Sequence, residues 1–171
     1  MPKIEMFFDH TCPYCHRGHS YLKELWPKFP SVEILWRPVE AHPKTEEPEH
    51  MPYEDLAVQG VFFVRDAGGD ELAYHERVYR AYFEEKLAPD DIAVLARCAE
   101  DIGLDGAAFA EALKTAKYEK PQREANDHAY EQNRVWAVPT FVCGDKRLDA
   151  QEGVGVTKEQ LEAFLSECCG G

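Results

Sequence analysis

The chain has 171 residues, of which 44% are hydrophobic and 30% are charged, as is typical of a soluble globular protein. Its formal net charge of -13 comes from 32 Asp and Glu against 19 Lys and Arg. A field of that sign repels phosphate backbones and anionic membrane surfaces, and no apolar stretch approaches the roughly 20 residues that a membrane-spanning helix needs. We therefore expect neither nucleic acid nor a membrane among its partners.

The first residues and the cysteines indicate a compartment. The segment MPKIEMFFDH lacks the basic start and the long apolar run of a secretory signal, which predicts a cytoplasmic protein. Six cysteines are too few and too irregularly spaced for a disulfide framework in a chain of this size. Only the pair Cys12 and Cys15 has a spacing that suggests chemistry.

The N-terminal part reads as a βαβ unit. Residues 3–8 (KIEMFF) are predicted to form a strand that ends in a tight turn. From Pro13, apolar residues recur every three or four positions, which predicts an amphipathic helix with Pro13 at its first position. Residues 31–39 are predicted to form a second strand, parallel and adjacent to the first.

The remainder of the chain is a helical block followed by a hairpin and a helix. Apolar stripes predict helices over 72–87, 92–102 and about 121–134, with Asp105 as an N-cap. Residues 43–52 (PKTEEPEHMP) form the only loop rich enough in proline and charge to suggest mobility. Strands at 140–144 and 146–150 are predicted to form a hairpin, and Thr157 with Gln160 a capping box for the last helix.

The segment HTCPYCH contains a Cys-x-x-Cys pair that is open to three interpretations. A covalent haem site needs export to another compartment, and the chain begins without a signal. A zinc site could use Cys12, Cys15 and His19, but a structural site needs a fourth ligand. A redox dithiol needs a strand, a tight turn and a helix N-terminus, and this context is predicted here. In that interpretation the Cys12 thiolate attacks a disulfide and Cys15 resolves the intermediate.

A second signal lies far along the chain. The segment VWAVPTFV places Pro139 at the start of an apolar strand, a position where a cis peptide bond is expected. The combination of this proline with a Cys-x-x-Cys pair at the start of a βαβ unit is a quite specific signal of a redox site.

These motifs resemble the DsbA-like, FrnE-type branch of the thioredoxin-fold superfamily. The matching segments are FFDHTCPYC, WRPVEAHP, VYRAYFEE, LARCAEDIGLD, VPTFV and LDAQ. The resemblance implies an α/β, thioredoxin-like fold over residues 1–45 and 135–171, with an inserted all-helical domain over 46–134. It also implies thiol-disulfide oxidoreductase activity on protein or small-molecule thiols and disulfides. Glutathione is a candidate co-substrate, and no metal or other cofactor is expected.

The resemblance also assigns roles to residues. Cys12 is expected to be the nucleophile and Cys15 the resolving thiol, while Val138 and Pro139 form a backbone platform that pairs with substrate. Pro13 and Tyr14 complete the expected substrate-binding set. The same branch includes glutathione-dependent S-transferases and 2-hydroxychromene-2-carboxylate isomerases, which typically carry Ser in place of Cys12. That activity is the alternative.

One departure from the pattern concerns the proton acceptor. Many thioredoxin-fold enzymes bury a carboxylate six residues before the nucleophile, where this chain has Met6. Glu5 is one position away and is expected to point to the opposite side of the sheet. The acceptor for the Cys15 proton is therefore open.

Several other residues carry weaker expectations. His10 and His16, if protonated, would favour a thiolate at Cys12. Cys98 and Cys143 are expected to be buried, and Cys168 and Cys169 to lie in a frayed tail. A group of aromatic residues either lines a groove facing Cys12 or packs between helices: Phe62, Phe63, Tyr79, Tyr82 and Phe83.

Overall fold

The computed structural model describes residues 1–170 and contains one four-stranded sheet. The strand order is β2-β1-β3-β4, in which β1 pairs parallel with β2 and antiparallel with β3, and β3 and β4 form an antiparallel hairpin. The predicted βαβ unit and the predicted hairpin are therefore confirmed. The strands are β1 (Lys3–Phe8), β2 (Glu33–Pro38), β3 (Thr140–Cys143) and β4 (Lys146–Asp149).

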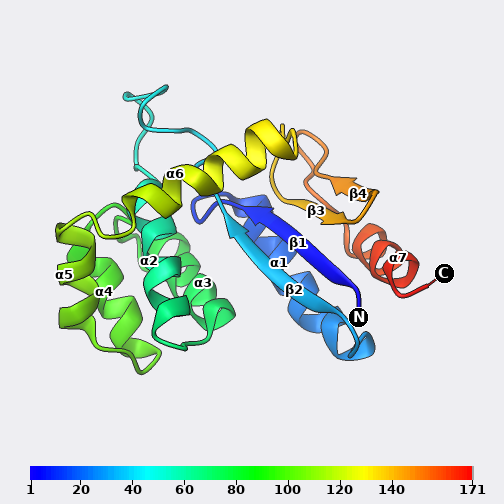
Figure 1. Cartoon of the computed structure of the whole chain (residues 1–171), viewed down its shortest axis with the longest axis horizontal. Coiled ribbons are helices and arrows are strands. Elements are labelled where there is room, and N and C mark those ends of the chain that lie inside the picture. Colours follow the sequence, from blue (N-terminus) through cyan, green and yellow to red (C-terminus); the bar gives the residue numbers. More distant parts are fainter. Residues whose placement is uncertain (171) are drawn as a thin grey trace.

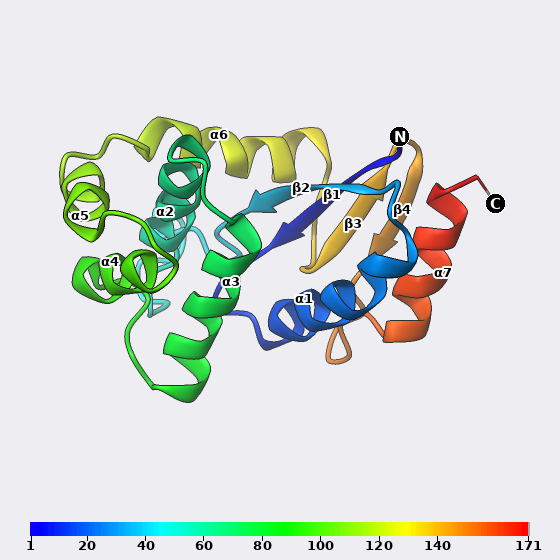
Figure 2. The same cartoon turned by 90° about the horizontal axis from the view of Figure 1, so that it is seen from below.

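Helices cover both faces of this sheet (Figure 2). On one face lie α1 (Pro13–Leu25), which continues into a short 3-10 turn, and α7 (Lys158–Cys168). They bury the side of β1 that carries Ile4, Met6 and Phe8. On the other face Phe7 packs against Ala129, which lies in the extension of α6 (Glu119–Asp127). The part of β1 that is covered on both faces is its second half, and this half is continuously apolar from Met6 to Phe8.

The first four helices after β2 form a second core at one end of the molecule (Figure 1). The residues that fill this core include Val61, Val64, Tyr74, Leu95 and Phe109. Asp70, Asp91 and Asp105 each cap a helix through a side-chain hydrogen bond to the backbone, as predicted for Asp105. The elements are α2 (Asp55–Asp66), α3 (Glu71–Tyr79), α4 (Ile92–Asp101) and α5 (Gly106–Lys114).

Two of the predicted helices end differently from the prediction. The helix expected over 72–87 is α-helical only to Tyr79 and continues as a π-helical turn to Glu84, where the Glu85 N–H donates to Arg80 O. The helix expected to start near 121 begins at Glu119 and has the same kind of ending, in which the Asn133 N–H donates to His128 O. In each ending a hydrogen bond joins residues five positions apart. The chain then leaves the helix through a residue with a positive φ, Lys86 in one case and Arg134 in the other.

Three buried histidines lie where the helical block meets the sheet. His10 follows β1, His19 belongs to α1 and His75 to α3, and each is at most 1% exposed. His10 Nε2 lies 3.1 Å from His75 Nδ1, and the Phe8 ring packs edge-on against all three imidazoles. Burial lowers the pKa of His10 to about 4 and that of His19 to about 3, and holds the pKa of His75 well below its usual range. The cluster is therefore uncharged at neutral pH.

None of the helices in residues 1–170 is both long enough and apolar enough to cross a membrane. The longest helices of the chain are amphipathic and pack against the sheet or against each other.

Because the three histidines are buried, we expect the folded protein to lose stability in mild acid. Each imidazole titrates near pH 6.5 in the unfolded chain, but its pKa is lowered in the folded protein. The unfolded state therefore binds more protons below pH 6.5. The free energy of unfolding should then fall as the pH drops from 6.5 towards 4, by up to about 1.4 kcal/mol per pH unit for each histidine.

Urea denaturation between about pH 7 and pH 5, with EDTA present, measures this slope. The His75→Gln variant is expected to have a shallower slope than the wild type, because one of the three groups is removed. The His50→Gln variant, which lies outside the cluster, should keep the wild-type slope. Equal slopes for His75→Gln and the wild type would contradict the prediction.

Candidate active site

Cys12 is the N-cap residue of α1. The chain leaves β1 at Phe8 and turns through a hydrogen bond from Cys12 N–H to the Asp9 carbonyl. Cys12 then has an extended backbone, and Pro13 opens the helix. The Cys12 sulfur accepts the Cys15 N–H at 3.3 Å, so it takes the place that a Ser or Asp oxygen has at an ordinary N-cap.

The two thiols have opposite environments. Cys12 is partly exposed, whereas Cys15 is fully buried beneath it. Hydrogen bonds from the Cys15 thiol and from the Cys15 and Tyr14 backbone amides lower the pKa of Cys12, although partial burial opposes them. Burial, and then the hydrogen bond to Cys12, raises the pKa of Cys15 well above its usual range. A negative charge at this site therefore belongs on Cys12.

The segment before β3 lies directly beside Cys12. The Val138 carbonyl oxygen is 3.8 Å from Cys12 Sγ, and the Val138–Pro139 peptide bond is cis. Gly18 of α1 allows this approach, because a Cβ there would lie 3.3 Å from Pro139 Cγ. Residues separated by more than 120 positions in sequence are thus brought together, as the motifs predict.

Tyr14 packs against the loop between β4 and α7. A Cβ on Gly155 would lie 2.9 Å from Tyr14 Cβ, and Gly155 has a positive φ of 77°. The Arg17 guanidinium lies over the Tyr14 ring at 5.3 Å and donates to the Val154 carbonyl oxygen. Tyr14 is therefore packed between Gly155 and Arg17.

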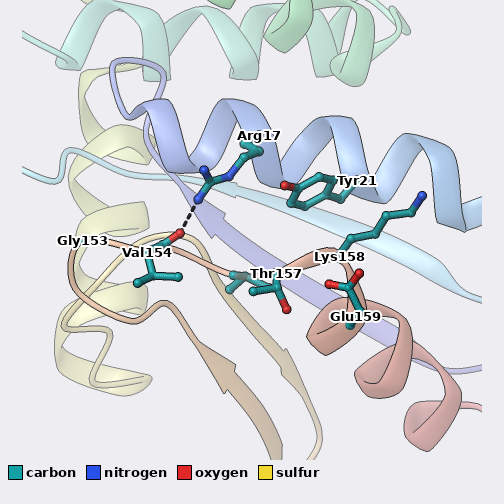
Figure 3. A pocket seen from close by; sticks show the side chains of 8 residues that line it. Arg17, Tyr21, Gly153, Val154, Thr157, Lys158 and Glu159 are labelled. Carbon is teal, nitrogen blue, oxygen red and sulfur yellow. Dashed lines mark hydrogen bonds between the residues drawn. The ribbon is translucent and has the colours of Figure 1, made fainter.

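A cavity of about 520 Å³ opens on this side of α1 (Figure 3). Arg17 and Tyr21 reach into it from α1, and Thr157, Lys158 and Glu159 from the start of α7. Two of these residues are cationic in a protein that is strongly acidic. No local sequence pattern predicts this cavity, because its two walls come from opposite ends of the chain.

The buried carboxylate of the site is Asp9. Met6 is fully buried in the core, and Glu5 lies on the opposite face, as predicted. There it binds Arg37 and His128. Asp9 is also fully buried, and its N–H donates to Cys15 Sγ at 3.5 Å. Its carboxylate accepts hydrogen bonds from Thr11 and Ala41. Its charge opposes the lowering of the Cys12 pKa and adds a little to the raised pKa of Cys15, which is due mainly to burial. Asp9 was not predicted, because the carboxylate was expected on the strand, whereas Asp9 lies in the turn after it.

The histidines near the thiols do not play the expected part. His10 is buried and uncharged at neutral pH, so it supplies no positive charge to Cys12. His16 stacks on Tyr79 and Phe83, at 4.8 and 5.4 Å between ring centroids. Burial lowers its pKa as well. The thiolate is therefore stabilised by hydrogen bonds and not by imidazolium charge.

The weaker expectations have mixed outcomes. His19 Nδ1 lies 2.9 Å from the Cys15 carbonyl oxygen, and the possible metal-binding clusters in residues 1–170 do not include Cys12, Cys15 or His19. Cys98 is buried as predicted, but Cys143 is partly exposed. The expectation of a frayed tail was wrong for Cys168, which is the last residue of α7 and forms a hydrogen bond with the Cys143 thiol.

The five aromatic residues do not line one groove. Phe63 packs on Phe109 inside the helical core, and Phe62 stacks on Tyr118. Tyr79 is fully buried, so only Tyr82 and Phe83 remain partly exposed near His16. Helix packing explains most of this set.

Comparison with known proteins agrees with this geometry. A model of the DSBA-like thioredoxin domain matches residues 54–166. The uncharacterized protein YwbO of Bacillus subtilis strain 168 is 32% identical over 192 residues, which cover 92% of this chain and 94% of YwbO.

Solved structures share the fold at low sequence identity. A probable DsbA oxidoreductase of Streptomyces coelicolor superimposes with a TM-score of 0.81 at 17% identity, covering 99% of this chain and 91% of the other. The cytosolic disulfide reductase DsbM of Pseudomonas aeruginosa, solved with GSH, superimposes with a TM-score of 0.73 at 17% identity, covering 96% and 98%. The chain therefore belongs to the DSBA-like thioredoxin family and has the fold of its thiol-disulfide oxidoreductases.

Proposed function

We propose that the chain is a thiol-disulfide oxidoreductase whose reacting groups are Cys12 and Cys15. The observation that carries this proposal is the asymmetry of the pair: an accessible thiol with a lowered pKa caps a helix above a buried thiol with a raised pKa. Such a pair divides the two steps of disulfide exchange between an attacking and a resolving group.

The reaction begins with the Cys12 thiolate. It attacks one sulfur of a substrate disulfide, forms a mixed disulfide and releases the other substrate sulfur as a thiolate. Cys15 then loses its proton and attacks Cys12 Sγ, which forms the Cys12–Cys15 disulfide and releases the second substrate thiolate. Two electrons pass from the dithiol to the substrate, and the reverse sequence oxidises a substrate dithiol.

The expected substrates are protein or small-molecule thiols and disulfides, with glutathione as a candidate co-substrate. Val138 lies beside Cys12 and offers its backbone groups to an extended peptide. Pro139 completes this platform, although its carbonyl oxygen already accepts the Ala150 N–H. Pro13 and Tyr14, which follow Cys12 at the start of α1, are the other proposed substrate contacts. DsbM, which shares the fold, is described as a cytosolic disulfide reductase and was solved with GSH. This likeness supports a cytoplasmic site of action and glutathione as a co-substrate. No cofactor is needed beyond the redox-active pair. The retained Cys12 thiol weighs against the transferase and isomerase alternative.

Replacing the resolving thiol should trap the intermediate. In Cys15→Ser, the attack on Cys12 Sγ cannot occur, so incubation with glutathione disulfide should leave glutathione bound at Cys12. Mass spectrometry of the intact protein and of its peptides measures the adduct and its site. The Cys12→Ser variant is the matched control and should carry no adduct in this segment. An unmodified Cys12 in Cys15→Ser would refute the proposed reaction.

The pH dependence of alkylation tests the cause of the lowered Cys12 pKa. Because the largest contribution is the hydrogen bond from the Cys15 thiol, Cys15→Ala should move the alkylation midpoint of Cys12 to higher pH. Cys15→Ser keeps a hydroxyl donor and should move it less. Iodoacetamide rates across about pH 5 to 10, with Cys12 identified by peptide mass, give the midpoints. Identical midpoints in the two variants would contradict this cause.

A further inference from the structure

A second group of potential ligands lies outside the dithiol, in the loop between β2 and α2. This loop stands away from the rest of the chain in Figure 1, where it is drawn in cyan. One ring nitrogen each of His42 and His50 and one carboxylate oxygen of Glu54 lie within 4.8 Å of one another. The three residues come from both arms of the loop, so the loop must fold back on itself to bring them together.

Glu54 is a buried carboxylate without a cationic partner. It is only 1% exposed, and its Oε2 accepts the backbone N–H of His42 at 3.2 Å. Its Oε1 is buried and meets no hydrogen-bond donor in residues 1–170. Within the same residues no Lys or Arg forms an ion pair with Glu54 or with the adjacent Asp9. Buried carboxylates are normally paired or bound to a metal ion.

The two imidazoles lie against each other near this carboxylate. The His42 and His50 rings stack with centroids 3.6 Å apart and planes at 20°, so their nitrogens are close but their lone pairs run nearly parallel. His42 Nδ1 lies 3.0 Å from Glu47 Oε2. A carboxylate in that position holds a metal-ligating histidine in one orientation and leaves its Nε2 lone pair for the metal.

A proton shared with Asp9 would satisfy the Glu54 carboxyl group alone. It would not account for two imidazoles within 4.8 Å of this carboxylate, one of them oriented by a further carboxylate. Two neutral imidazoles and one carboxylate are the set that binds zinc in many sites with an open fourth position. Binding requires the two stacked rings to turn apart, so that their lone pairs converge and the ligand atoms, now within 4.8 Å, reach the roughly 3.3 Å spacing of a tetrahedral zinc site.

We infer that His42, His50 and Glu54 form a binding site for a divalent metal ion of the zinc class, with the fourth position open to water. His50 is exposed, so the ion can enter from solvent. The site is distinct from the dithiol and does not depend on its chemistry. The bound ion would fix the loop to the start of α2, next to the turn that carries Cys12, because Ala41 N–H donates to Asp9 Oδ2 at 2.8 Å.

Zinc binding by the full chain tests this inference. The accessible thiols are first alkylated with iodoacetamide so that they cannot bind zinc, and the protein is dialysed to equilibrium against ZnCl2. Atomic absorption then gives bound zinc per chain. The test compares the wild type with His50→Ala and Glu54→Gln, and uses Glu49→Gln as the control because Glu49 is an exposed carboxylate of the same loop. Circular dichroism verifies that each variant is folded.

The alkylated wild type and Glu49→Gln are expected to bind one zinc ion per chain. His50→Ala and Glu54→Gln should bind it at least about 100-fold more weakly, since even loss of a partner behind a ligand costs roughly 10- to 100-fold. His50 is exposed, so His50→Ala remains informative if Glu54→Gln does not fold. The inference is wrong if the alkylated wild type binds no zinc, if folded His50→Ala binds as the wild type does, or if Glu49→Gln loses the ion equally.

Discussion

The hydrogen bond from the Cys15 N–H to Cys12 Sγ connects the fold to the site. A sulfur caps α1 where an oxygen would ordinarily do so, and the unpaired amides of the first turn then stabilise negative charge on that sulfur. The helix can begin there because β1 delivers the chain to the turn and Pro13 needs no N–H partner. The same helix buries Cys15 against the sheet, so one short segment produces two thiols of opposite character.

The helical block packs against the turn that carries Cys12. His75 and Tyr79 of α3 are fully buried against the turn before Cys12, and the Tyr79 hydroxyl lies 3.0 Å from His19 Nδ1 on α1. The block has its own core, and its contact with the sheet includes the cluster of uncharged imidazoles and the aromatic rings around it. Protonation of such groups is costly in a buried site. The position of Cys12 therefore depends on an interface that is sensitive to acid.

Local sequence patterns account for much of this structure, and contacts between distant segments do not follow from them. Three local features appear as predicted, and each acts within a few residues: Pro13 after Cys12, the hairpin that turns at Gly144 and Asp145, and the capping box of Thr157 with Gln160. The π-helical endings could not be foreseen, because a hydrogen bond that spans one residue more leaves the apolar pattern unchanged. Nor could the pairing of His10 with His75, or the group of His42, His50 and Glu54, which lies in a loop that composition alone marks as mobile. The division of the chain at residues 45 and 135 remains a prediction.

The central claim is that Cys12 and Cys15 interconvert between a dithiol and a disulfide. The most direct measurement is their equilibrium oxidation in metal-free protein across glutathione buffers of known potential, read by alkylation and peptide mass. The account predicts a reversible two-electron midpoint within about -270 to -120 mV, the range of related enzymes. A pair that never closes to a disulfide in any of these buffers would contradict the account.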